Sequence, residues 1–175
     1  SDANDKAKAN NVVAFLTPIT KGFMTEMATE LANLGIQIYG GHGFIREWGM
    51  EQLVRDARIT QLYEGTNGIQ ALDLISRKLA RDKGTMLEDT HALFASKVAE
   101  VSDSQAKTQA EALLQEWLST AEQLKSLNAI DLAAAATDFM HYSAYCLLGV
   151  IWLSMADTAS KNTNEKIKTR QSKNM

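Results

Sequence analysis

Cysteine and proline are almost missing from this sequence, whose 175 residues contain one of each, Cys146 and Pro18. A single cysteine cannot form an internal disulfide, which fits a reducing compartment, and we expect a cytoplasmic protein. Neither sign of charge is in large excess, because the net charge is only −3. That balance predicts no nucleic-acid partner and no attraction to a charged membrane surface.

Targeting features are also missing from the first residues, SDANDKAKAN. They include no initiator methionine, no apolar signal core and none of the Arg-rich, acid-poor character of an organelle transit segment. We therefore expect the chain to be a fragment or a processed piece of a longer protein.

The sequence also lacks the patterns that are typical of β-strands. No run alternates apolar and polar residues between turn signals, whereas 45% of the residues are hydrophobic and many recur every three or four positions. This predicts an all-α fold with enough apolar surface for a core, as one domain or two small ones.

The single proline suggests where the first helix begins. Thr17 followed by Pro18 is typical of an N-cap and a first helical position, where the missing N–H of proline does no harm. We predict a helix from Pro18 to about Gly35, after a short helix that bends at the proline. The segment YGGHGF, Tyr39–Phe44, has three glycines in four positions and predicts a turn.

Further helices follow the glycine turn. The spacing of apolar residues predicts one from Met50 that stops at Gly65, and another that begins with Thr66 or Asn67 as its cap. Beyond Gly84 we predict three more, over residues 86–101, 104–127 and 129–160, with breaks at Ser102, Asp103 and Asn128. The expected organisation is a helical unit over 1–83, a second over 84–160 and a basic, frayed tail over 161–175.

One apolar run, Phe139–Ala156, raises the question of a membrane span. Its polar residues, and the lack of a second span, favour a central bundle helix in which Cys146 and His141 are core residues. No metal site is predicted, because His42, His91 and His141 fall on different elements without ligand-spaced partners.

The candidate functional residues lie in two glycine-containing segments. Gly40, Gly41 and Gly43 leave room for a ligand to approach the backbone, although a plain helix-to-helix turn has the same composition. Glu64 stands between Tyr63 and Gly65, and a carboxylate desolvated there would be a stronger base because its pKa rises. The alternative is an exposed carboxylate at a helix boundary.

The stretch Gly35–Leu74 resembles the C-terminal signature of acyl-CoA dehydrogenases, flavoenzymes that desaturate acyl-CoA thioesters between the α and β carbons. The matching residues are Gln37, Gly40, Gly41, Gly43, Phe44, Glu47, Arg55 and Asp56. One position departs from the pattern, because Gln52 stands where the family usually has Lys or Arg. The resemblance covers about residues 10–80 well and the rest loosely.

The resemblance implies roles for individual residues. Glu64 of the YEGT motif would remove the α-proton while hydride from the β-carbon passes to N5 of FAD. Tyr63, Gly65 and Thr66 would line the flavin ring and the acyl pocket, with Thr66 toward the cofactor. Arg77 would reach the CoA of the acyl-CoA substrate.

The same resemblance implies an assembly. Gln37, Gly40 and Gly41 match positions that touch the FAD of a neighbouring subunit, so a dimer or a dimer of dimers is expected. Electron-transferring flavoprotein would be the acceptor.

The chain is similar to a long subfamily with an extra C-terminal helical domain, which includes enzymes acting on 3-methylthiopropionyl-CoA. The family's N-terminal helical and middle β domains are not in these residues, so the chain alone is expected to bind FAD weakly or not at all and to be inactive. It is also expected to self-associate through Phe139–Ala156.

Two alternative functions stay open. One is an acyl-CoA oxidase of the same fold, and the other is a helical interaction module without chemistry.

Overall fold

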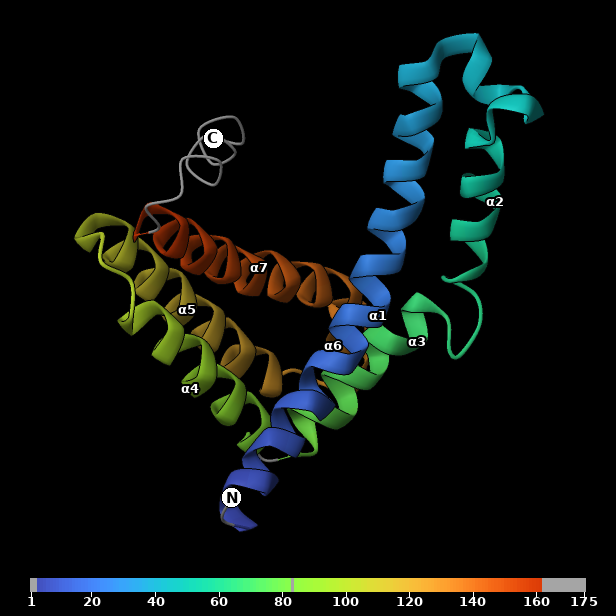
Figure 1. Cartoon of the computed structure of the whole chain (residues 1–175). Coiled ribbons are helices and arrows are strands. Elements are labelled where there is room, and N and C mark those ends of the chain that lie inside the picture. Colours follow the sequence, from blue (N-terminus) through green and yellow to red (C-terminus); the bar gives the residue numbers. More distant parts are fainter. Residues whose placement is uncertain (1–2, 83, 162–175) are drawn as a thin grey trace.

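The computed structural model describes residues 3–82 and 84–161, and every element within those ranges is helical, as Figure 1 shows. The elements are α1 (Ala3–Tyr39), η1 (Gly40–Phe44), η2 (Arg46–Trp48), α2 (Met50–Ile59), α3 (Asn67–Leu72), η3 (Asp73–Ala80), α4 (Thr85–Ala99), α5 (Ser104–Lys125), α6 (Ala129–Ala134) and α7 (Ala136–Lys161). The predicted all-α class is therefore confirmed. The expected basic tail over 162–175 lies outside the described residues.

Helix α1 runs through the proline instead of starting there. It is continuous from Ala3 to Tyr39 with Pro18 inside it, so the predicted start at Pro18 and end near Gly35 were wrong. Thr17 is not an N-cap, since its hydroxyl donates to the Val13 carbonyl one turn back at 2.7 Å. Pro18 itself is buried with Phe15 and Ile19. Tertiary packing of this face outweighs the lost backbone hydrogen bond.

Helix α2 lies antiparallel to the C-terminal half of α1, and together they form an arm that projects from the rest of the molecule (Figure 1). The two helices are joined at its tip by η1 and η2, where the sequence predicted a turn. Gly43 is required for this closure, because a Cβ there would lie 2.5 Å from the Ile36 carbonyl oxygen. In α1 no residue after Phe23 is buried, and α2 has no buried residue. The arm is therefore an exposed, largely two-helix structure.

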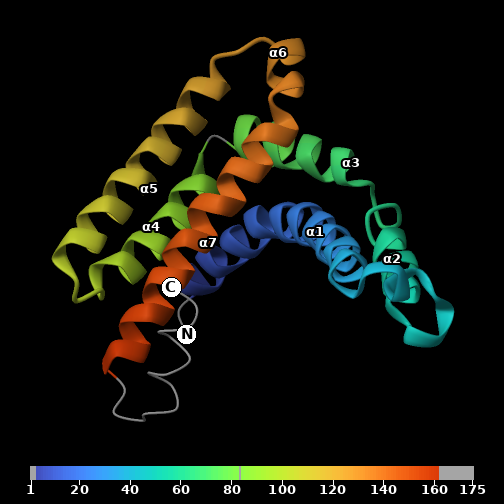
Figure 2. The ribbon, with the colours of Figure 1, turned by 90° about the horizontal axis from the view of Figure 1, so that it is seen from above.

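The remaining helices pack around the N-terminal half of α1. Figure 2 shows α7 crossing beside α1, with α5 farther from α1 and α6 linking α5 to α7. Helix α4 packs against α1 as well as against α5 and α7. One core joins them, and it takes side chains from both sides of Gly84, among them Phe15, Leu74, Leu87, Trp117 and Met140. The chain does turn at Gly84, whose φ is +99°. The division into two units there stays a prediction.

Several predicted helix boundaries are confirmed by their caps. Thr66, Asp103 and Asn128 are the N-caps of α3, α5 and α6, and each side chain accepts a backbone N–H. Such caps are readable from sequence because the hydrogen bond stays within three residues. The second helix was extended too far, since α2 ends at Ile59 and not at Gly65. The last predicted helix is split into α6 and α7.

Helix α7 is part of the core, as expected for the apolar run. Eight of its residues are buried, including Phe139, Met140 and Cys146. By length and composition, α7 is also the one helix among the described residues that could cross a membrane, and 39% of its most apolar stretch is buried in the fold. A single helix of this kind is weak support for a membrane span, because the core helix of a soluble protein has the same character.

Candidate functional site

Glu64 lies in the loop between α2 and α3, five residues beyond the end of α2. Its backbone is left-handed, with φ +53°, which is unusual for a residue that is not glycine. The side chain is exposed, so the partial desolvation predicted from its neighbours is not present in this chain. The reason is that the loop projects from the bundle, and its neighbour Tyr63 is itself 51% exposed.

The residues after Glu64 lead directly into α3. Gly65 is also left-handed, with φ +85°, and Thr66 caps the helix by accepting the Ile69 N–H at 3.4 Å. Tyr63, Glu64, Gly65 and Thr66 are thus neighbours by chain continuity in one exposed turn. Their predicted roles toward flavin and substrate stay predictions.

The residues predicted to contact FAD across subunits lie at the tip of the arm. Gln37, Gly40 and Gly41 are all exposed. Gly40 has φ +61°, and a Cβ at Gly40 or Gly41 would meet no atom within 4 Å. This open backbone could accept a flat or phosphate-bearing group, so the residues present fit a contact to FAD. The helix between this turn and Glu64 has 10 residues, about 15 Å in length, which puts the two turns at opposite ends of α2.

Arg77 lies in neither turn. It is in η3, on the far side of α3 from the Glu64 loop, and pairs with Asp73 one turn earlier. Its side chain is 65% exposed and can therefore leave Asp73 for another anion. The predicted site residues thus occupy three places in this chain.

Two side chains that the sequence did not single out hold the Glu64 loop. Lys21 of α1 donates to the Gly65 carbonyl at 2.6 Å, and Gln70 of α3 donates to the Glu64 carbonyl at 3.0 Å. A lysine between the apolar residues Ile19 and Phe23 was the available signal. Its partner, 44 residues away, could not be read from spacing.

His141 is not the simple core residue that the sequence predicted. Its Nε2 lies 2.6 Å from Oε2 of Glu26 on α1, and both side chains are only partly buried. The pairing joins residues 115 positions apart, so no local pattern could indicate it.

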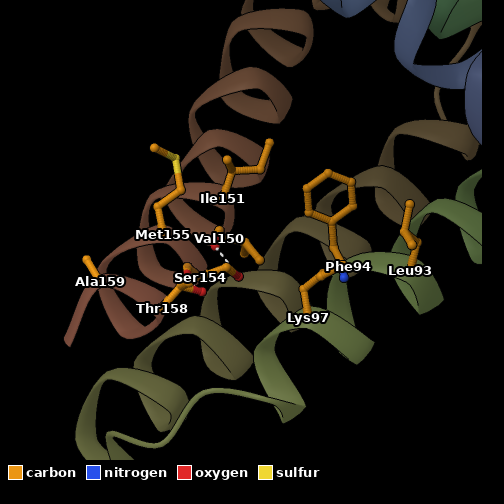
Figure 3. A pocket seen from close by; sticks show the side chains of 9 residues that line it. All are labelled: Leu93, Phe94, Lys97, Val150, Ile151, Ser154, Met155, Thr158 and Ala159. Atoms are coloured by element: carbon orange, nitrogen blue, oxygen red, sulfur yellow. Dashed lines mark hydrogen bonds between the residues drawn. The ribbon is translucent and has the colours of Figure 1, made fainter. Parts of the chain in front are cut away.

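An apolar cavity of about 620 Å³ lies between α4 and the C-terminal half of α7. Figure 3 shows the side chains that line it, which are Leu93, Phe94, Lys97, Val150, Ile151, Ser154, Met155, Thr158 and Ala159. None of the predicted site residues is among them. This end of α7 points away from α3 (Figure 1), so the cavity is separate from the Glu64 loop.

Similar proteins were found by sequence comparison. The chain is 47% identical over 104 residues to 3-methylmercaptopropionyl-CoA dehydrogenase of Ruegeria pomeroyi, which is 59% of this chain and 18% of that protein. A butyryl-CoA dehydrogenase of Syntrophomonas wolfei is 31% identical over 173 residues, or 94% of this chain and 28% of that protein. A broad-specificity linear acyl-CoA dehydrogenase of Mycobacterium tuberculosis is 39% identical over 60% of this chain and 16% of that protein.

The chain therefore spans less than a third of the length of each of these three relatives. The family described as acyl-CoA dehydrogenase, C-terminal domain, matches residues 2–80. That range contains α1, α2, α3, the glycine turn at the tip of the arm and the Glu64 loop. Residues 2–80 thus match the C-terminal domain of acyl-CoA dehydrogenases, and these three similar proteins are all named as acyl-CoA dehydrogenases.

Proposed function

We propose that this chain is the C-terminal portion of an FAD-dependent acyl-CoA dehydrogenase in which Glu64 removes the α-proton of an acyl-CoA thioester. The observation that supports this most strongly is the family match over residues 2–80, which includes an exposed carboxylate on a loop with an unusual backbone. The α-proton of a thioester is only weakly acidic, so a positioned general base contributes a large part of the rate.

The residues around Glu64 have complementary tasks in this proposal. Tyr63 and Gly65 border the acyl group, and Thr66 lies toward the cofactor. The exposed Arg77 binds an anionic group of CoA, while Gln37, Gly40 and Gly41 contact the FAD of a partner subunit in a dimer or tetramer. When bound, FAD supplies the acceptor for the hydride that leaves the β-carbon.

We further propose that the chain alone does not turn over substrate and binds FAD weakly or not at all. Its exposed arm and exposed Glu64 support this, because neither excludes the water that a flavin site must exclude. Titration of FAD into the purified chain tests this part of the proposal. One flavin bound per chain, with its absorbance band retained after desalting, would contradict it.

The reaction class is tested on the complete enzyme of which we propose this chain to be a part. We expect a yellow protein that reduces an artificial dye with acyl-CoA, and a substrate panel then identifies the acyl group. The proposed acceptor is electron-transferring flavoprotein, and the rival is an acyl-CoA oxidase that uses oxygen. Stopped-flow reoxidation by that flavoprotein, but not by oxygen, is the expected result; fast reoxidation by oxygen would favour the oxidase.

A further inference from the structure

The backbone of the Glu64 loop is in a conformation that costs free energy. Glu64 and Gly65 are both left-handed, with φ +53° and +85°, and Glu64 is the one non-glycine residue with positive φ in the described part of the chain. Glycine adopts this conformation freely, whereas the Cβ of a glutamate crowds its own backbone. Such a residue keeps its conformation only where surrounding contacts hold it.

Both carbonyl groups of this strained pair are held by side chains from different helices. Gln70 donates from α3 to the Glu64 carbonyl at 3.0 Å. Lys21 donates from α1 to the Gly65 carbonyl at 2.6 Å, a short distance typical of a charged donor. The loop is thus fixed between two helices directly beside the Glu64 side chain.

Asn67 holds the ammonium group of Lys21 in place through a second hydrogen bond. Asn67 is 8% exposed, and its Oδ1 accepts from Lys21 Nζ at 3.0 Å. The Thr25 hydroxyl lies 3.1 Å from the same oxygen, but it is closer to the Lys21 carbonyl, at 2.7 Å. Nδ2 donates to the Gly22 carbonyl at 3.0 Å and to Glu26 Oε1 at 3.1 Å. The Lys21 ammonium group can only donate, and the Gly22 carbonyl and the Glu26 carboxylate accept from Nδ2. Asn67 therefore has one orientation, and it keeps Lys21 aimed at the loop.

The network of hydrogen bonds around Asn67 extends to α7, the last helix that the structure describes. Glu26 uses its second oxygen to contact His141 Nε2 of α7 at 2.6 Å. The His141 ring also packs edge-on against Phe23 of α1, with the ring centres 5.7 Å apart. Helix α7, which lies beyond the family match, is thereby connected to the Glu64 loop through Glu26, Asn67 and Lys21.

We propose that Lys21 and Asn67 are positioning residues that hold Glu64 in its left-handed conformation, with Glu26 and His141 fixing Asn67. This rests on the proposed function, because it explains how an exposed base keeps the placement that proton abstraction needs. A base displaced by about 1 Å can lose on the order of a hundredfold in rate. The Lys21 ammonium contacts the Gly65 carbonyl and Asn67, so in this proposal it acts through Glu64.

The first test measures the loop directly, without activity. In the purified chain, the ¹³Cα and ¹³C′ chemical shifts of Glu64 and Gly65 report their backbone conformation. We expect left-handed values in the wild type, their loss in Lys21→Met and Asn67→Leu, and their recovery in Lys21→Arg, which keeps a donor. Lys8→Met is the control, since Lys8 is exposed on the same helix. Wild-type shifts in Lys21→Met would overturn the proposal.

The second test uses the complete enzyme. Lys21→Met should lower kcat by about tenfold or more while KM stays within about twofold, because substrate binding is kept and the base is misplaced. Lys21→Arg should recover much of kcat, and Lys8→Met should equal the wild type. A loss confined to thermal stability, with kcat unchanged, would mean that Lys21 is only structural.

Glu64→Gln, measured beside these variants, separates the two proposals. Full activity of Glu64→Gln would defeat the proposed function itself. Loss of activity in Glu64→Gln together with a fully active Lys21→Met would defeat only the positioning role. If Lys21→Met does not fold, Gln70→Met removes the other loop donor from a half-buried position, and the same changes in shift and kcat are required of it.

Discussion

At the scale of single residues, Trp117 is the largest side chain that the fold removes completely from water. Its ring meets Phe15 of α1 edge-on, with centres 6.0 Å apart. Its Nε1–H donates to the hydroxyl of Ser143 on α7 at 2.9 Å, and Ser143 is fully buried as well. The indole therefore joins α5 to two other helices through one packing contact and one hydrogen bond.

We predict that Ser143→Ala destabilises the chain by about 1–3 kcal/mol, because it leaves the buried indole N–H without an acceptor. Urea denaturation followed by circular dichroism measures this change. Ser96→Ala is the control, since Ser96 is exposed and its hydroxyl bonds only its own helix. Equal stability of the two variants would contradict the predicted role of Ser143.

The residues of the candidate site were predictable only as far as local patterns reach. Glu64, Gly65 and Thr66 could be placed in a turn before a helix because glycine and the cap act within a few positions. The exposure of Glu64 was one of two alternatives that the sequence left open, since it depends on how the loop leaves the bundle. Lys21 and His141 were not assigned their roles, because their partners lie 44 and 115 residues away in the sequence.

At the scale of elements, Asp157 ties the end of α7 to the connection between α4 and α5. Its carboxylate contacts Lys161 one turn later at 2.5 Å and accepts the Ser102 N–H at 2.9 Å. The Lys161 ammonium first, and the Ser102 N–H second, hold the pKa of Asp157 below its ordinary value of 3.8. The carboxylate form is therefore favoured by folding.

This pKa sets a pH dependence of stability. Because the folded pKa of Asp157 is lowered, the stabilisation is fully present above about pH 4 and is lost as the pH falls below it. We predict that Asp157→Asn is less stable than the wild type at pH 6, and that the difference shrinks steadily in acid. Urea denaturation between about pH 6 and pH 2.5 measures it. A difference that is independent of pH would contradict this prediction, and Lys161→Met should reproduce part of the effect.

Helix boundaries were predicted correctly where a capping residue marks them and less well where only the spacing of apolar residues was available. Asp103 and Asn128 marked helix starts correctly because each caps its own backbone. The helix start predicted at Pro18 was wrong, because packing of a buried face can keep a helix continuous through a proline. The early end of α2 was also missed, since Leu62 and Tyr63 continue an apolar spacing yet lie exposed in the loop.

At the scale of the whole molecule, apolar side chains are exposed on the arm and on α7, within the residues that the structure describes. On the arm formed by α1 and α2, Leu31, Ile38 and Phe44 are 65%, 83% and 79% exposed. On α7, Trp152 and Met155 are 60% and 57% exposed, and Met155 lines the cavity against α4. Exposed apolar side chains that lie together are typical of surfaces that contact another protein. The α7 surface lies within Phe139–Ala156, the run through which the sequence predicted self-association. The exposed arm was not predicted, because apolar residues at helical spacing indicate an amphipathic helix but not whether a partner covers it.

We predict that the chain self-associates and that the α7 surface contributes to the contact. Sedimentation velocity over a range of concentrations should show a species heavier than a monomer. Trp152→Lys should weaken it, because a charge placed in an apolar contact must be desolvated. Ile130→Lys on α6, which is 81% exposed away from that cavity, is the control. A clean monomer of the wild type at high concentration would contradict the prediction.

The most direct test of the account is the rate at which acyl-CoA reduces bound FAD in Glu64→Gln of the complete enzyme, followed without oxygen by stopped-flow absorbance. Glutamine keeps the size of the side chain and removes its ability to take a proton. We predict that FAD stays bound and that reduction slows by about 100- to 10,000-fold. Glu111→Gln, an exposed position on α5, should reduce at the wild-type rate. Equal rates in Glu64→Gln and Glu111→Gln would contradict the assignment of Glu64 as the base.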